Sequence, residues 1–467
     1  MTPGTLDRRA FLQSMGAVLS PASKPLNFVF ILVDDWGWTD AGCYGSQLYE
    51  TPNIDRLAAR GARFTNAYAA APLCSPTRAS ILTGKSPARL KMTTALPGTV
   101  RTKPSHKWVS PEMPPGLLLS ERTIAERLKP AGYVSASIGK WHLGGREYDP
   151  RKSGFEVNIG GFDGGMAPSQ FYPGWKGKSR GVPLEGRPGE YLADRLTDEA
   201  IRFIEVSREQ PFFLYLAHYS VHTPIEAKSD LTEKYRRRVD PSKPQHHPTY
   251  AAMMESVDQS VGRVARKLDE LGLASRTVIF VASDNGGVNQ VQTYTPDPLP
   301  PTANLPLRAG KAWLYEGGIR SPLVVYWPGN GKPRTVCEEP VISADFFPTM
   351  VEMAGLKRDA QDPVDGMSLV PLLKGQRIKR EALYWYFPHY DFRPTGAVRK
   401  GDFKLIEFYD DDHAELYNLA KDIGEQHNLA DSMPQKTAEL RGMLQKWLKA
   451  SHAPMMNPNP AYQPPGL

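Results

Sequence analysis

The chain has 467 residues, and 57 Lys and Arg against 50 Asp and Glu give it a formal net charge of +7. With 40% apolar and 10% aromatic residues it can bury a sizeable core, which excludes a disordered protein. Three cysteines are too few for a disulfide framework, 40 Gly and 43 Pro favour long loops over a helical bundle, and no apolar run after the N-terminal segment is long enough to predict a membrane span.

Residues 1–23 have the composition of an export signal. Arg8 and Arg9 precede a short apolar stretch at 15–19, which small residues follow. The paired arginines resemble the bacterial twin-arginine signal, which exports chains that are already folded. A disordered tail with a chance arginine pair is the alternative. We expect an exported protein, periplasmic or extracellular, whose fold starts near Lys24.

Five apolar runs have the pattern of strands buried on both faces, at residues 27–33, 133–138, 211–217, 277–282 and 323–327. Helical patterns lie between them, with apolar residues at three- and four-residue spacing at 190–206 and 249–271. Strands that alternate with helices predict an α/β domain over residues 24–375. In it, a large and mostly parallel sheet is sandwiched by helices.

After residue 375 the pattern changes to shorter runs. Residues 382–387, 397–406 and 415–419 have the pattern of short strands, and residues 435–450 that of a last helix. We therefore expect a C-terminal subdomain over residues 376–467, with a small antiparallel sheet, a helix and a tail.

Four of the apolar runs end in polar residues that are capable of chemistry. In chain order these are Asp34 and Asp35, Lys140 and His142, His218 and His222, and Asp284 and Asn285. Because ligands of open α/β sheets bind beyond the carboxyl ends of the strands, the pattern predicts a single site at one edge of the sheet.

The acidic residues among them predict a metal site. Asp34 and Asp35 are adjacent carboxylates, which would repel each other in a buried place unless a cation neutralised them. Asp284 and Asn285 add further oxygen ligands, and this donor set favours Ca²⁺ or Mg²⁺ over Zn²⁺. Either pair alone could equally cap a helix or form a turn, so the prediction depends on their combination.

Residues 73–84 are the most informative stretch. Ser75 as N-cap and Gly84 at the end predict a helix between them. Cys74 then lies just before a helix N-terminus, where backbone N–H groups favour an anion, and Arg78 can reach the same point. On these grounds Cys74 is either a nucleophilic thiolate or a buried structural cysteine.

The motif Cys74-x-Pro76-x-Arg78 followed by Leu82-Thr83-Gly84 resembles the signature of the type I sulfatases, in which this cysteine is oxidised to Cα-formylglycine. The resemblance covers the chain from Asn27 to about Leu429 and implies an alkaline-phosphatase-like fold. Further blocks occur in the family's order, namely Asp34-Asp35, Thr51-Pro52-Asn53-Ile54-Asp55, Gly139-Lys140-Trp141-His142, His222-Thr223-Pro224, Asp284-Asn285-Gly286, Gly310-Lys311, Glu316-Gly317-Gly318, residues 415–419 and Asn428-Leu429.

The resemblance implies a metal site, with Ca²⁺ preferred over Mg²⁺, that consists of Asp34, Asp35, Asp284, Asn285 and the modified residue 74. It also implies a maturation enzyme that generates formylglycine. The hydrated aldehyde of that residue would attack sulfur as a covalent nucleophile.

The remaining catalytic residues would act on charges and protons. Arg78 and Lys140 would stabilise the anionic centre. His222 and Lys311 would protonate the departing alcohol or hold the sulfate, and His142 would take the proton whose removal releases sulfate.

Four further residues are predicted to line the substrate pocket, although ordinary loop positions would also explain them. These are His218, Arg101, His106 and Arg146. Cys43 and Cys337 have no partner motif and are predicted to be structural or free.

The implied function is hydrolysis of a sulfate ester on a carbohydrate. Residues 72–76, 87–90 and 96–98 resemble bacterial polysaccharide sulfatases related to N-acetylgalactosamine and galactose sulfatases. This implies a 4- or 6-O-sulfate on a galactose-type sugar of a marine polysaccharide or a glycosaminoglycan, in an oligo- or polysaccharide substrate.

Two other classes of function compete with this one. A phosphomonoester or phosphonate hydrolase on the same scaffold is the alternative, but such phosphatases typically use two metals and a Ser or Thr nucleophile. A non-catalytic polyanion-binding protein would not need this set of carboxylates beside a cysteine and two histidines. No motif predicts nucleic-acid binding, and the oligomeric state stays open.

Overall fold

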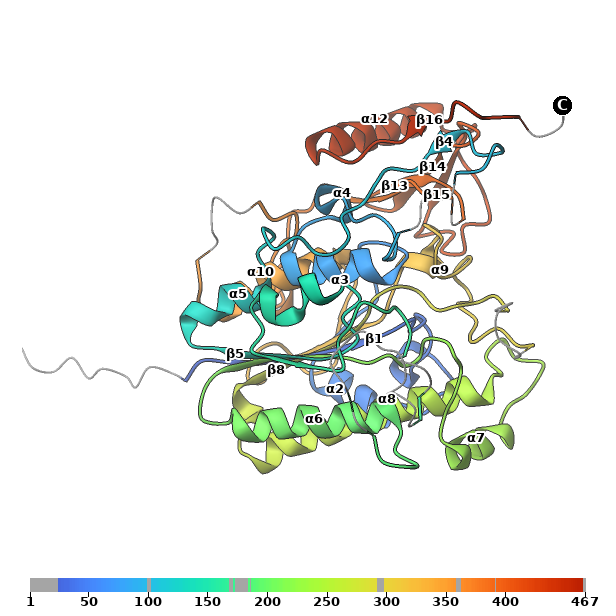
Figure 1. Ribbon diagram of the computed structural model, residues 1–467. Coiled ribbons are helices and arrows are strands. Elements are labelled where there is room, and N and C mark those ends of the chain that lie inside the picture. The colour runs from blue at the N-terminus through green and yellow to red at the C-terminus, as the bar shows by residue number, and fades with distance from the viewer. Residues whose placement is uncertain are drawn as a thin grey trace, which may run out of the picture.

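The computed structural model describes residues 24–98, 102–167, 171–172, 184, 186–291, 298–357, 363–390 and 392–464. A long mixed sheet lies at its centre (Figure 1), in the order β10-β2-β9-β8-β1-β7-β5-β6. Its strands are β1 Asn27–Val33, β2 Ala62–Phe64, β5 Val134–Gly139, β6 Val157–Ile159, β7 Phe212–Ala217, β8 Thr277–Ser283, β9 Leu323–Tyr326 and β10 Thr335–Cys337. β9 is antiparallel to both of its neighbours, and the other pairs are parallel.

β1 shows why these strands are continuous apolar runs. All seven of its residues are buried, because helices cover both faces of the sheet. Val29 and Ile31 pack on one side with α2 Pro52–Arg60, α6 Leu192–Val206 and α8 Pro248–Glu270. Phe28 and Phe30 pack on the other side with α3 Cys74–Thr83, α5 Ile124–Leu128 and α10 Phe346–Met353. Figure 1 shows these two helical layers below and above the sheet.

A second sheet lies beside this core, above α3 and α4 in Figure 1. It is antiparallel, in the order β12-β13-β14-β15, and α12 Pro434–Ala450 packs on it. Its strands are β12 Leu383–Phe387, β13 Thr395–Lys400, β14 Phe403–Phe408 and β15 Ala414–Asn418. We call residues 376–464 the C-terminal subdomain. Near its end β16 Asn457–Pro458 pairs with β4 Trp108–Val109, so the chain's tail returns to the first domain.

Shorter elements complete the fold. They are β3 Ala67–Tyr68 paired with β11 Val341–Ile342, the helices α4 Pro87–Leu90, α7 Ser229–Arg236, α9 Glu316–Ile319 and α11 Val370–Leu373, and 3₁₀ turns at Gly42–Tyr44, Lys129–Ala131, Arg146–Tyr148, Pro150–Ser153, Ala274–Arg276 and Ser343–Asp345. Among the described residues, no helix combines the length and apolar character that crossing a bilayer requires.

The predicted fold class is confirmed, with one correction at the start of α3. This helix begins at Cys74 with Leu73 as N-cap, whereas Ser75 was predicted to cap it. The Ser75 hydroxyl instead accepts a hydrogen bond from the N–H of Leu96 at 3.0 Å. Cys74 therefore lies inside the first turn. The predicted signal at 1–23 lies outside the described residues, and the domain boundary at residue 375 stays a prediction.

Candidate active site

The carboxyl ends of three neighbouring strands bring the acidic residues together. The N–H of Asp34, directly after β1, donates to the carbonyl of Ser220, beyond the end of β7, at 3.0 Å. The N–H of Asp284, directly after β8, donates to the carbonyl of Val33 at 3.3 Å. The three carboxylates of Asp34, Asp35 and Asp284 belong to residues that are at most 1% exposed.

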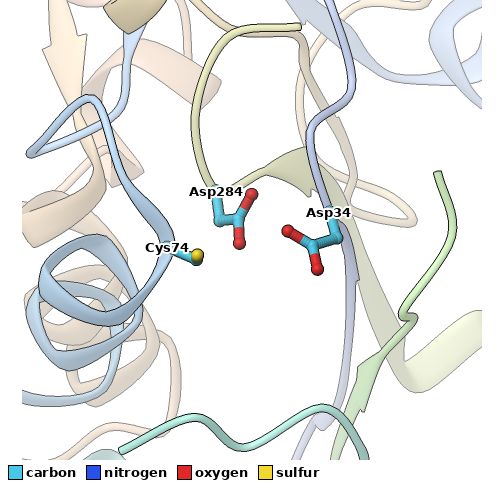
Figure 2. Close-up of side chains that lie close together, drawn as sticks. All are labelled: Asp34, Cys74 and Asp284. Carbon is cyan, nitrogen blue, oxygen red and sulfur yellow. The ribbon is translucent and has the colours of Figure 1, made fainter. Parts of the chain in front are cut away.

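Cys74 faces this acidic group from α3. The residue is 3% exposed, and all ten residues of the helix are buried. Figure 2 shows its side chain directed toward the carboxylates of Asp34 and Asp284. The Sγ atom and one oxygen of each carboxylate lie within 4.8 Å of one another. Because N–H groups at a helix N-terminus favour negative charge, the position of Cys74 suits a reaction that develops an anion.

Arg78 lies one turn further along α3 and ties the helix to two strand ends. Its Nε donates to Asp284 Oδ2 and its Nη1 to the carbonyl of Lys140, each at 2.9 Å. Its Nη2 lies 3.9 Å from Asp34 Oδ1. Burial opposes the charged form, but Asp284 and the other acidic groups nearby, among them Asp34, together outweigh it, so the pKa of Arg78 is raised and the guanidinium stays charged.

Lys140 and Asp34 form an ion pair in the interior. The Lys140 Nζ donates to Asp34 Oδ2 at 2.5 Å, and both side chains are fully buried. Burial, and after it the charge of Asp284, raises the pKa of Asp34 well above its usual value, whereas Lys140 lowers it. The ionised form of Asp34 therefore depends on positive charge close by.

Asp35 faces a different set of partners, because its φ of 61° lies in the left-handed region. Asn285 Nδ2 donates to its Oδ1 at 2.7 Å, and Lys311 Nζ donates to its Oδ2 at 2.8 Å. His222 Nε2 lies 3.7 Å from the same Oδ2. Burial alone would raise the pKa of Asp35, but Lys311 and then His222 outweigh it and hold the pKa below its usual value.

The oxygen atoms of this group fit a hard divalent cation. Among the described residues, Asp34 Oδ1 and Asn285 Oδ1 are buried without a hydrogen-bond partner. Buried polar atoms are normally satisfied, so two orphaned acceptors beside three carboxylates suit a cation as their partner. Asp34, Asp35, Asp284 and Asn285 would offer oxygen ligands, which favours Ca²⁺ or Mg²⁺ over Zn²⁺.

In both His142 and His222, one ring nitrogen lies against a backbone carbonyl, which leaves the other nitrogen available for a different partner. His142 Nε2 lies 2.9 Å from the Leu96 carbonyl, and His222 Nδ1 lies 2.8 Å from the Thr223 carbonyl. A carbonyl only accepts, so these nitrogens carry the hydrogens and the other nitrogen of each ring is an acceptor. Burial, reinforced by nearby lysines, lowers the pKa of both histidines, that of His222 to about 3. Both rings are neutral at pH 7 and able to accept a proton.

Comparison with known proteins identifies the family. The family model described as Sulfatase matches residues 26–356. The chain belongs to the sulfatase family. A second model, described as N-sulphoglucosamine sulphohydrolase, C-terminal, matches residues 309–453 of this sulfatase. The predicted family and the predicted enzyme class, a sulfuric ester hydrolase, are confirmed.

Similar curated proteins carry sulfatase names. Human N-acetylgalactosamine-6-sulfatase is 34% identical, over 80% of this chain and 70% of the relative. A protein of Formosa agariphila named Sulfatase is 32% identical, over 93% of this chain and 90% of the relative. Human arylsulfatase A is 31% identical, over 92% and 88%.

Solved structures agree in fold. The structure described as Ps i-CgsB in complex with k-i-k-neocarrahexaose has a TM-score of 0.77 and 28% identity, over 91% of this sulfatase and 93% of that chain. A phosphonate monoester hydrolase of Agrobacterium radiobacter has a TM-score of 0.64 at 19% identity, over 92% and 96%, and shows a shared fold alone.

The structure of the sulfatase brings all predicted catalytic and metal-binding residues into one buried group. Its members are Asp34, Asp35, Cys74, Arg78, Lys140, His142, His222, Asp284, Asn285 and Lys311. The individual roles assigned to them stay predictions.

Those predicted substrate-pocket residues that the structure describes have no contact with this group in the hydrogen bonds and ion pairs given above. His218 is fully buried, and its Nε2 lies 2.9 Å from Ser260 Oγ on α8. Its ring therefore contacts α8, and its predicted role in substrate binding stays a prediction. His106 stacks on Tyr390 with ring centroids 4.0 Å apart, Arg146 is exposed on a 3₁₀ turn, and both stay predictions. Arg101 lies outside the described residues.

Cys43 and Cys337 are free cysteines, as predicted. Burial raises the pKa of both thiols, which makes them poor nucleophiles at neutral pH.

A second buried ionic group, which the sequence analysis missed, lies next to the segment that carries Lys311. Lys404 Nζ on β14 donates to Glu316 Oε1 and to Glu425 Oε1, each at 2.9 Å, and all three side chains are fully buried. Glu425 Oε2 accepts from the N–H of Glu316 at 2.7 Å, and Arg320 Nε donates to Glu316 Oε2 at 2.7 Å. The signal that could have revealed this group is Lys404 itself, a charge within the apolar strand β14.

This ionic group and Arg308 clamp the segment between residues 308 and 317. Arg308 Nη1 donates to Tyr417 Oη and to the carbonyl of Glu425, each at 2.9 Å. The Arg308 carbonyl accepts from the N–H of Gly317 at 2.9 Å, and the N–H of Lys311 donates to Gly287 at 3.1 Å. The C-terminal subdomain therefore helps to position Lys311 on Asp35.

We predict that Lys404→Met destabilises the sulfatase by about 3–5 kcal/mol, because it leaves Glu316 and Glu425 buried with less positive charge. Urea unfolding of the full chain measures the loss. Lys400→Met is the matched control. Lys400 lies on the neighbouring strand β13, and its side chain forms an exposed ion pair with Glu439 on α12. Lys400→Met should leave stability nearly unchanged. Equal losses of unfolding free energy in the two variants would show that the buried ion pairs of Lys404 contribute no more to stability than the exposed pair of Lys400.

Proposed function

We propose that this sulfatase removes sulfate from a sulfated carbohydrate, with residue 74 as its nucleophile after conversion of Cys74 to formylglycine. The observation that carries the proposal is the position of Cys74. It begins a fully buried helix, and its side chain points at Asp34 and Asp284. A thiol at this point could attack sulfur but could not release the sulfate again, whereas the hydrate of an aldehyde supplies one hydroxyl for attack and a second whose proton can be removed to expel sulfate.

Asp34, Asp35, Asp284 and Asn285 would hold a divalent cation beside residue 74. Bound there, the cation would withdraw charge from the sulfate oxygens and favour a deprotonated nucleophile. Ca²⁺ is our choice over Mg²⁺, because several protein oxygens converge here and Ca²⁺ accepts many such ligands in irregular geometry.

The basic residues of the group would bind the substrate anion. Arg78 and Lys140 lie beside the carboxylates that face Cys74, and Lys311 contacts both carboxylate oxygens of Asp35. All three can direct N–H donors at sulfate oxygens as charge develops in the transition state.

Proton transfers fall to Lys311, His222 and His142. Burial would lower the pKa of Lys311, but Asp35, Cys74 and Asp34 together outweigh it and raise the pKa, so the ammonium can donate toward the departing alcohol oxygen. His222 lies 3.7 Å from the same Asp35 carboxylate, and its Nε2 can take up and relay this proton, or hold the sulfate once the ring is protonated. His142, with its bare Nδ1, can accept the proton whose loss releases sulfate.

A galactose-type sugar with a 4- or 6-O-sulfate, in a marine polysaccharide or a glycosaminoglycan, is the substrate that we propose. The resemblance to N-acetylgalactosamine-6-sulfatases supports it, as does the likeness to a structure solved with neocarrahexaose. The net charge of +7 is compatible with a polyanion. We also propose that the protein is exported through the twin-arginine-like residues 1–23 and that a maturation enzyme modifies Cys74.

Cys74→Ala should abolish turnover and leave the fold intact, because the helix that carries residue 74 keeps its other contacts. Sulfate release from a sulfated galactosamine oligosaccharide and thermal unfolding measure the two effects. Cys43→Ala and Cys337→Ala are matched controls that should keep activity. Near-normal turnover of Cys74→Ala would remove residue 74 from the mechanism.

Intact-mass analysis of active protein tests the modification separately. We expect the mass loss that corresponds to an aldehyde in place of the thiol at residue 74, and peptide mapping should locate it there. Fully active protein with an unmodified Cys74 would refute the formylglycine proposal.

Chelation tests the metal site. Removal of the divalent cation should lower both activity and the melting temperature, since a ligand present at 100 times its Kd stabilises by about 2.7 kcal/mol. Ca²⁺ should restore both quantities better than Mg²⁺. The melting temperature of the Asp284→Asn variant should change much less on addition of chelator or Ca²⁺. A melting temperature of the wild-type protein that does not change with chelator would argue against the metal site.

A paired set of substrates tests the rival function. We expect sulfate release from sulfated sugars to exceed hydrolysis of the matching phosphate and phosphonate monoesters by at least about 100-fold in kcat/KM, a transition-state difference of about 2.7 kcal/mol. The reverse order of rates would assign the chain to the phosphonate hydrolase class.

A further inference from the structure

A cavity of about 240 Å³ opens directly onto the catalytic group. Asp35, Lys311 and Leu73, the neighbour of Cys74, line its inner end. Val288, Asn289, Gln290 and Ala312 continue the wall, and Phe392 closes it from the C-terminal subdomain. The cavity is therefore shared by the two parts of the chain, and its size suits one or two sugar rings.

Phe392 is one of the exposed large apolar side chains in the part of the chain that the structure describes. It is 39% exposed, yet it lines a concave site beside buried catalytic residues. Its segment connects β12 and β13. An aromatic ring that is exposed to a cavity, with polar side chains elsewhere in the lining, is typical of a ligand-binding pocket.

The ring of Phe392 is backed by a fixed stack of side chains. It packs edge-on against Trp313, with centroids 5.5 Å apart and an interplanar angle of 64°. Trp313 packs on Tyr315, and the Arg308 guanidinium lies 3.9 Å over the Tyr315 ring. This stack belongs to the same segment that places Lys311 on Asp35.

The chain next to Phe392 is anchored as well. Arg393 donates from Nε and Nη2 to the two carboxylate oxygens of Asp410, at 3.0 and 2.7 Å, and from Nη2 to Asp411 at 2.8 Å. Its guanidinium carbon also lies 4.6 Å from the centre of the Phe408 ring. Because the ring packs on Trp313 and the following residue, Arg393, is anchored, Phe392 is held in place before a ligand arrives, which lowers the entropy lost on binding.

We propose that Phe392 is a specificity-determining residue, against which the C–H face of the sugar that carries the scissile sulfate packs. This inference rests on the proposed function. The amide side chains of Asn289 and Gln290 would form hydrogen bonds with hydroxyls of this sugar ring, while Lys311 lies toward its sulfate group.

Sugar stereochemistry then decides which ring fits. In a galactose-type ring the axial oxygen at C4 leaves the hydrogens on C3, C4 and C5 together on one face, as a continuous apolar patch. In a glucose-type ring these hydrogens alternate between the faces, so an aromatic wall contacts a more polar surface. The Phe392 wall therefore favours the galactose-type substrate over its glucose-type epimer.

The test compares two substrates that differ at C4 alone, N-acetylgalactosamine 6-sulfate and N-acetylglucosamine 6-sulfate. For Phe392→Ala we expect kcat/KM for the galactose-type sugar to fall about tenfold, mainly through KM, with a much smaller change for the glucose-type sugar. Phe392→Tyr should keep the wild-type preference, whereas Phe392→Leu, which has no aromatic face, should lose it. Met455→Ala, another exposed apolar position of the C-terminal subdomain, is the control that should change neither substrate.

The outcomes separate this inference from the proposed function. If the wild-type enzyme releases sulfate neither from these two sugars nor from a sulfated galactosamine oligosaccharide, the proposed function fails. If the wild-type enzyme releases sulfate, two results would refute the role of Phe392. One is a wild-type ratio of kcat/KM between the two sugars in Phe392→Ala, and the other is the same wild-type ratio in Phe392→Leu. An equal loss on both sugars would likewise refute a role in specificity and indicate a purely structural one.

Discussion

Charge balance among buried side chains is the constraint on which the rest of the site depends. The carboxylates of Asp34, Asp35 and Asp284 are buried side by side, an arrangement that would force protonation if they stood alone. Three cations, Arg78, Lys140 and Lys311, each approach one or more of them within hydrogen-bonding distance. Each cation comes from a different part of the chain, namely α3, the end of β5 and the segment after β8. The ion pairs thus fix where these parts meet, because a displaced member would leave a bare charge in the interior.

The same balance explains why such a site selects an anion. Three carboxylates and three cations sum to neutrality, so the pocket without further charge has little electrostatic reason to bind a sulfate ester. A divalent cation on the orphaned oxygens of Asp34 and Asn285 would leave positive charge in excess, and the pocket would then attract a sulfate ester and stabilise the further negative charge of its transition state. Cation and substrate anion are therefore expected to bind cooperatively.

The sheet and the strand-end residues of the catalytic group were predictable from local patterns, whereas Lys311 and the role of Cys74 were predicted through the family resemblance alone. Apolar runs that end in Asp34, Lys140 and Asp284 define strands and place polar groups at one edge. Alternation of side chains along a strand decides which residue after it reaches the site, and here prediction was less secure. His218 follows β7 directly but lies against α8, whereas Asp35 reaches the site through a left-handed backbone that the sequence pattern does not reveal.

The contributions of the C-terminal subdomain could not be predicted in this way, because they depend on contacts between residues far apart in sequence. Lys404 meets Glu316 from 88 residues away, and Phe392 meets Trp313 across the same boundary. The two family models overlap between residues 309 and 356, where the segment of Lys311, Trp313 and Glu316 lies. That segment contacts the carboxylates on one side and the antiparallel sheet on the other. The β12–β13 connection therefore lines the cavity beside the carboxylates through Phe392. If Phe392 acts as we propose, a change in this connection would alter substrate choice while the carboxylates and their cations stay in place.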